Sequence, residues 1–122
     1  MNENINTRPP GSEVEQLPRL ASELLEQARE HPARRAARTI RSGSSLRATV
    51  IALLSGAELA EHDAPPAATL QVLHGEVRLH WQDGERTLEQ GEITDIPAAR
   101  HALLALTDAV VLLTVALHAG PA

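Results

Sequence analysis

Leucine and alanine residues recur at helical spacing near the start of the chain. On one face of a helix this spacing gathers Leu17, Leu20, Leu24, Leu25 and Ala28. Pro18 suits the first turn of a helix, and Pro32 disfavours helical backbone at His31 just before it. We therefore predict one amphipathic helix within residues 17–32, which must pack its apolar face on another part of the fold. Residues 1–16 are polar and contain prolines, so we expect a flexible N-terminal arm there.

From residue 33 onward the pattern changes to short apolar or β-branched runs separated by turn residues. The runs that we expect to form strands are 36–41, 46–54, 69–73, 76–81, 85–88, 92–96, 101–106 and 109–117. Asp83-Gly84 between two of them is typical of a tight hairpin. Short strands at this spacing indicate a sandwich or barrel, so we predict an all-β barrel over residues 33–122 with one N-terminal helix.

Alternation along two of these runs predicts which side chains share the interior, because neighbours on a strand face opposite sides. The predicted interior set is Ala68, Leu70, Val72, Val77, Leu79 and Trp81. Gln71, Arg78 and His80 then face away from it.

Composition narrows the classes of function. The chain has 122 residues, 43% of them apolar, which suits one domain with a real core. Its one aromatic residue is Trp81, so the stacking platforms that bind bases are missing.

Eleven basic residues, all arginine, stand against sixteen acidic ones. Six arginines fall within residues 29–47, which we interpret as a solvated strand edge or a contact between subunits, and we expect no nucleic-acid partner.

Cysteine is absent, which excludes disulfides and thiolate chemistry. The start of the chain lacks the apolar run of a signal peptide, and no stretch approaches the ~20 apolar residues of a membrane span. We therefore expect a cytoplasmic protein with no membrane partner.

A first motif begins at a glycine and ends at a glycine. Gly56 is followed after five residues by His62, and Gly75 lies further along. Ala64 and Ala68 lie between His62 and Gly75.

A second motif follows at a similar spacing. Gly91 is followed after five residues by Pro97, then by Ala99 and His101. Each motif therefore places one imidazole at the end of a β segment.

Together these motifs resemble those of the cupin superfamily, specifically its small single-domain members of the type-2 conserved barrel. In that family the first motif has a second histidine and a glutamate where this chain has Ala64 and Ala68. In the second motif a glycine stands at Ala99, and His101 comes one residue early. The resemblance covers about residues 47–117 and implies a cupin-type β-barrel, or jelly roll.

Cupins commonly hold iron, manganese, nickel or zinc with three histidines and one glutamate. The resemblance leaves at most His62 and His101 as metal ligands here, and a divalent ion needs more donors than two imidazoles. Glu61 and Asp63 flank His62, and alternation predicts that they point away from it. We therefore expect either no cofactor or a weakly bound divalent metal.

The most direct prediction is a small molecule bound in the barrel cavity beside a depleted metal site. Its polar or anionic group would contact His62, His101 and Arg100, since imidazoles and guanidinium groups bind such groups. The predicted apolar wall consists of Leu70, Val72, Leu79 and Trp81. No catalytic residue is identified.

Two alternatives stay open. One is a metal-dependent cupin enzyme of dioxygenase or isomerase type, because a metal with vacant positions can activate oxygen or polarise a carbonyl. The other is a structural or regulatory barrel without catalysis. In each case we expect a homodimer, which would cover exposed sheet edges and apolar surface.

Overall fold

The computed structural model describes the backbone of residues 14–62 and 67–117, and the side chains of residues 14–60 and 67–117. Most of the predicted flexible arm (residues 1–13) lies outside the described part, as do Asp63 and Ala64. Within it, one helix precedes nine strands. In chain order these are α1 (Leu17–Arg29), β2 (Arg35–Ser42), β3 (Leu46–Leu53), β4 (Glu58–His62), β5 (Ala67–His74), β6 (Glu76–Trp81), β7 (Gly84–Glu89), β8 (Ile93–Asp95), β9 (His101–Ala105) and β10 (Ala109–Ala116).

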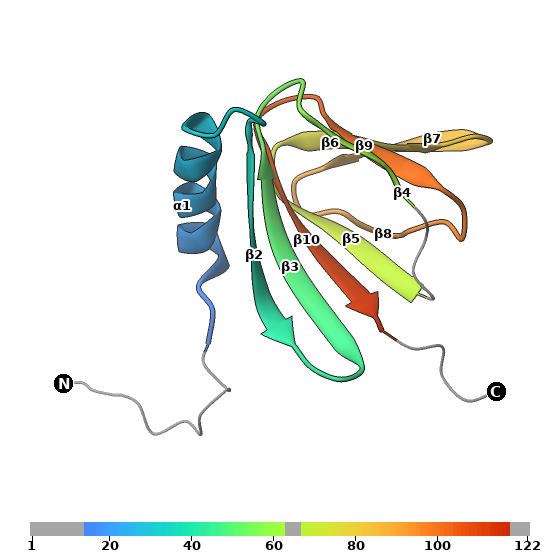
Figure 1. Ribbon diagram of the computed structural model, residues 1–122. Coiled ribbons are helices and arrows are strands. Elements are labelled where there is room, and N and C mark those ends of the chain that lie inside the picture. The colour runs from blue at the N-terminus through green and yellow to red at the C-terminus, as the bar shows by residue number, and fades with distance from the viewer. Residues whose placement is uncertain (1–13, 63–66, 118–122) are drawn as a thin grey trace.

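The strands form two antiparallel sheets that face each other. One sheet has the order β2-β3-β10-β5-β8 and the other β4-β9-β6-β7. Figure 1 shows the sheets converging beside the top of the helix and diverging toward the opposite end. The predicted all-β fold with one helix is confirmed, although the two sheets do not close into a continuous barrel within the described residues.

An apolar layer fills the space between the sheets. It is built from residues that alternate along each strand, as the pleat requires. Its buried members are Ile51, Leu53, Ala57, Leu70, Val72, Val77, Leu79, Leu88, Leu103, Ala105, Ala109 and Val111. The predicted inward direction of the β5 and β6 side chains is therefore correct for Leu70, Val72, Val77 and Leu79, and Trp81 packs against the same layer.

A second apolar layer lies between α1 and the outer face of the five-stranded sheet, where Figure 1 places the helix. Leu20, Leu24 and Ala28 supply the helix side of this layer, and Val50 and Val110 supply part of the sheet side. Pro18 stands in the first turn, where its missing N–H has no helical partner to lose. The predicted amphipathic helix thus covers one sheet face and leaves the interior between the sheets to the strands.

Gly75 joins β5 to β6 at the end where the sheets converge. Its φ of 79° is in the left-handed region, and a Cβ built there would lie 2.2 Å from the Asp108 carbonyl oxygen. The neighbouring loops are tied together here by hydrogen bonds from the Ser55 N–H to Asp108 Oδ1 and from the Glu76 N–H to Thr107 Oγ1. This end of the sandwich is therefore tightly closed.

Candidate functional site

The inward-facing side chains become more exposed along the sandwich, from the closed end at Gly75 to the opposite end. On β3 the inward series runs from fully buried Leu53 through Ile51 to half-buried Thr49 and exposed Arg47. The inward series on β5 and β10 become more exposed in the same direction, ending at Ala68 and Val115. We call this end, formed by Arg47, Ala68, Val115, Trp81, Arg86 and His101, the open end.

A small cavity lies between the sheets next to the open end. Its wall consists of Ile51, Leu59, Leu70, Leu79, Ile96, Leu103, Leu113 and His101. The space open to the centre of a water-sized sphere is about 20 Å³, which is room for about one water molecule. Among the side chains that the structure describes, the wall is therefore hydrocarbon except at the imidazole of His101.

His101 is the one buried polar residue among those whose side chains are described, at 2% exposure. It begins β9, and its Nδ1 lies 2.9 Å from the carbonyl oxygen of Ala99. Because a carbonyl can only accept, Nδ1 carries the proton of this bond, and in the neutral ring Nε2 is the acceptor nitrogen. A polar side chain in an apolar cavity wall is costly to bury, which marks His101 as a candidate for function.

His62 ends β4, and its backbone is the register partner of His101 on β9. Leu59 pairs with Leu103 on the same two strands, so three steps along β4 match two steps along β9. This β-bulge places His62, and not Glu61, opposite His101. No pattern in the sequence predicts this bulge. The pairing of β4 with β9 places the backbones of the two histidines opposite each other.

Trp81 and Arg86 form one side of the open end. Trp81 is the register partner of His101 on the other flank of β9. The Arg86 guanidinium lies 5.0 Å from the Trp81 ring centroid, and its Nη1 donates to Thr94 Oγ1 and to the Asp95 carbonyl oxygen, each at 3.1 Å. Arg86 therefore links β7 to β8 across the gap between the sheets.

The other predicted contact residues take different places. Leu70 and Leu79 line the cavity, whereas Val72 is fully buried one inward position deeper and does not line it. Arg100 is exposed just before β9. Ala68 borders a surface groove with Val115 and lies outside the cavity wall.

Sequence reasoning missed Arg86 and most of the cavity wall. The hairpin turn between β6 and β7 could have predicted where Arg86 lies. The turn pairs Leu79 with Arg86, so both side chains face the inner side of the sheet. Leu59 was missed because the strand Glu58–His62 was not predicted. That segment has no β-branched residue, and its strand is defined by pairing with β9.

The residues at the four positions implied by the resemblance do not fit a full metal centre. Two of the four are alanines, and the described one, Ala68, offers only a methyl group. Among the side chains that the structure describes, no group of three or more histidines or carboxylates is placed to hold an ion. Two imidazoles without further protein donors make a poor site for a divalent cation.

Comparison with known proteins supports the fold. No family model and no curated protein sequence matches the chain. Among solved structures, a conserved protein of unknown function from Streptococcus pyogenes is 23% identical with a TM-score of 0.67, covering 91% of this chain and 96% of that one. A cupin superfamily protein from Desulfitobacterium hafniense is 14% identical with a TM-score of 0.65 over 69% of this chain and 78% of that one. KdgF from Halomonas is 19% identical with a TM-score of 0.62 over 72% and 83%.

These similarities show that the chain has the cupin fold, as the motifs at Gly56–Gly75 and Gly91–His101 predicted. Identities below 25% show the fold alone. No helix in the described residues is both long and apolar enough to cross a membrane.

Proposed function

We propose that this cupin-fold protein binds a small, mostly apolar molecule between its two sheets, with His101 contacting the polar atom of that molecule. The observation behind the proposal is the described part of the cavity wall, in which seven hydrocarbon side chains surround one buried imidazole. Small-molecule sites have this composition: an apolar lining with few polar groups that fix orientation.

The size of the cavity limits the ligand. As it stands, the space holds about one water molecule, so a larger guest must displace side chains. Leu59, Ile96 and Leu113 line the cavity and are only partly buried, so these side chains have room to rotate. A short chain entering from the open end is the shape that such movement accommodates.

A metal-dependent dioxygenase or isomerase is the competing function. It requires an ion at the paired positions His62 and His101, where the alanines at positions 64 and 68 supply no donor. The donor set therefore favours ligand binding without a resident metal ion.

Hexan-1-ol is a suitable probe, because it combines a short apolar chain with one hydroxyl group. Trp81 is the only tryptophan and stands beside His101 in register, so its fluorescence reports directly on the open end. We expect hexan-1-ol to shift this emission saturably. His101→Leu should weaken binding about fivefold, the equivalent of one hydrogen bond at ~1 kcal/mol. His74→Leu, at an exposed position at the end of β5, should leave binding unchanged.

Calorimetric titration with Zn²⁺, Mn²⁺, Ni²⁺ and Fe²⁺ tests the competing function on the same preparation. The proposal predicts no stoichiometric tight binding of any of them. Tight binding of one ion that is lost in His101→Leu would contradict the proposal and favour the enzyme. No response to hexan-1-ol or to metals would instead favour a structural or regulatory role.

We also propose a homodimer. β2 is an edge strand of the five-stranded sheet, and Ala37 and Thr39 are exposed on its inner face. Edge strands invite pairing with another chain unless they are covered. Size-exclusion chromatography with light scattering should give twice the monomer mass, and a monomer mass would exclude the dimer.

A further inference from the structure

Arg47 occupies the last inward position of β3, at the open end. Its register partner on β10 is Val115, whose partner on β5 is Ala68, so the three form one row across the inner face. The next row toward the cavity contains Thr49, Leu113 and Leu70, and two of these line the cavity. Adjacent rows on one face are about 7 Å apart, at roughly 3.4 Å per residue. Arg47 therefore begins one row outside the cavity, on the sheet that faces His101.

Most arginines of the described chain have a partner, and Arg47 does not. Arg38 pairs with Glu23 at 3.9 Å, Arg78 with Glu85 at 3.7 Å, and Arg86 is held by Thr94 and Asp95. Arg47 makes no hydrogen bond or ion pair with any residue whose side chain is described. Its guanidinium is exposed and has five N–H donors to offer an incoming group.

The surroundings of Arg47 in its row are uncharged. Val115 and Ala68 are hydrocarbon, and Ala68 presents only a methyl group where a longer side chain would fill the row. Asp95 on β8 is three strands from β3 and thus about 14 Å away at ~4.8 Å per strand. Asp95 pairs with Thr69, so it faces the opposite side of the sheet from Ala68.

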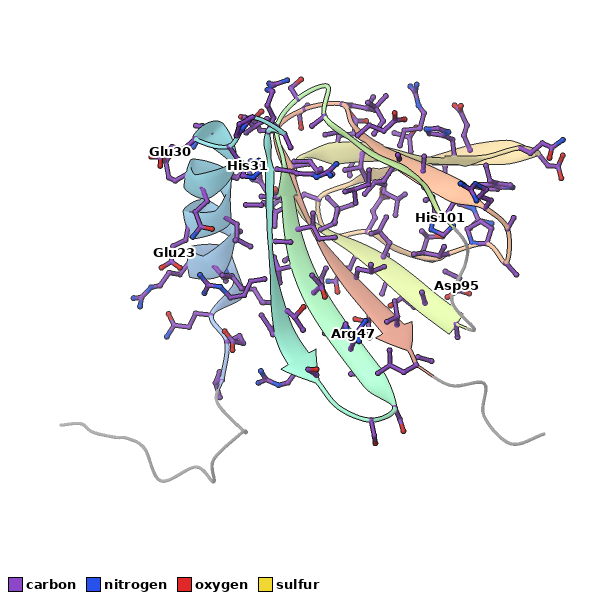
Figure 2. The ribbon with its side chains drawn as sticks, viewed as in Figure 1. Glu23, Glu30, His31, Arg47, Asp95 and His101 are labelled. Atoms are coloured by element: carbon purple, nitrogen blue, oxygen red, sulfur yellow. The ribbon has the colours of Figure 1, made fainter. Side chains whose placement is uncertain are left out.

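Figure 2 shows Arg47 near the lower end of β3 and His101 on the facing sheet, so the two groups belong to different walls of the opening. An apolar chain in the cavity would leave its head group between these walls. A carboxylate suits this position, since a guanidinium binds carboxylate oxygens in a two-pronged arrangement.

We propose that Arg47 is an anion-binding residue of the open end, and that the ligand of this protein is a short apolar molecule with a terminal carboxylate. The inference rests on the proposed binding function and adds the chemical class of the head group. Arg47 supplies the positive charge, His101 supplies the buried polar group, and the hydrocarbon wall receives the chain.

The test compares hexanoate with hexan-1-ol, which share a chain length and differ at the head group. Affinities are measured by Trp81 fluorescence for the wild-type protein and the variants Arg47→Met, Arg47→Lys and Arg38→Met. We expect wild-type protein to bind hexanoate about tenfold more tightly than hexan-1-ol, and the preference to shrink as salt is added. Arg47→Met should reduce the preference to about one, Arg47→Lys should keep part of it, and Arg38→Met, on the helix side of β2, should keep all of it.

The outcomes separate the two proposals. If both probes bind equally in wild-type protein, or if Arg47→Met keeps the full preference for hexanoate, the role of Arg47 is overturned while the binding function stands. If neither probe binds wild-type protein, both proposals fail. Because Arg47 is exposed and has no described partner, Arg47→Met should unfold at the same urea concentration as wild type, which shows that a lost preference does not arise from misfolding.

Discussion

The guanidinium of Arg86 lies over the ring of Trp81, 5.0 Å from its centroid. The same guanidinium donates hydrogen bonds to Thr94 and Asp95, so one side chain joins the β6–β7 hairpin to the short strand β8 of the other sheet. β8 has only three residues and one neighbouring strand, β5. Arg86 therefore links the two sheets along this edge.

Arg86→Met should loosen that edge. Loss of the two exposed hydrogen bonds and of the cation–π contact is expected to lower the free energy of unfolding by about 1 kcal/mol. Amide exchange of residues 93–96 should accelerate, and Trp81 emission should shift toward that of a solvated indole.

The matched control is Arg78→Met, on the outer face of the same hairpin. Arg78 pairs with Glu85 at 3.7 Å in an exposed ion pair, which is worth a few tenths of a kcal/mol. If this control accelerates exchange in β8 as much as Arg86→Met does, the tie between the sheets is not specific to Arg86.

Gly75→Ala should be severely destabilising. The new Cβ would meet the Asp108 carbonyl oxygen at 2.2 Å and the Thr107 hydroxyl oxygen at 2.7 Å, and the φ of 79° is itself unfavourable for alanine. We expect a loss of more than 2 kcal/mol in urea unfolding, because the left-handed conformation alone costs roughly 1–2 kcal/mol.

Gly91 offers the control for Gly75. It has a φ of 90°, but a Cβ there would have no atom within 4 Å. Gly91→Ala should therefore lower the free energy of unfolding only by the cost of placing alanine in the left-handed conformation, about 1–2 kcal/mol. Equal losses in the two variants would show that the contact with the 107–108 loop does not determine the effect.

Leu24→Ala tests the layer under the helix. Leu24 is fully buried against the outer face of the sheet, and truncation of a buried leucine costs about 2–5 kcal/mol. Leu46→Ala, at a side chain that is 48% exposed, should stay within about 0.5 kcal/mol of wild type. A small effect at Leu24 would mean that α1 is not an integral part of the fold.

Local patterns were enough to predict much of this fold. The helix follows from the 3.6-residue spacing of Leu20, Leu24 and Ala28, and the inward direction of Val77 and Leu79 follows from strand alternation. Both depend only on neighbours in sequence. The glycines of the two motifs mark turns, and Gly56, Gly75 and Gly91 all have positive φ.

The parts that were missed depend on partners distant in sequence. Leu59 lines the cavity because β4 pairs with β9, and the bulge that sets His62 opposite His101 is a property of that pairing. Arg47 reaches the open end because β3 lies beside β10 and β10 beside β5. Composition and spacing along one chain do not specify which strands become neighbours, so these residues could not be assigned before the sheet order was known.

The most direct test of the cavity as the binding site is a methyl NMR titration of isoleucine-, leucine- and valine-labelled protein with hexanoate. The two apolar layers serve as site and internal control in one spectrum. We predict saturable shifts at Leu70, Leu79, Leu103 and Leu113, with Leu20, Leu24 and Leu25 under the helix unchanged. Shifts confined to the helix layer, or none at any cavity methyl up to millimolar hexanoate, would contradict binding between the sheets.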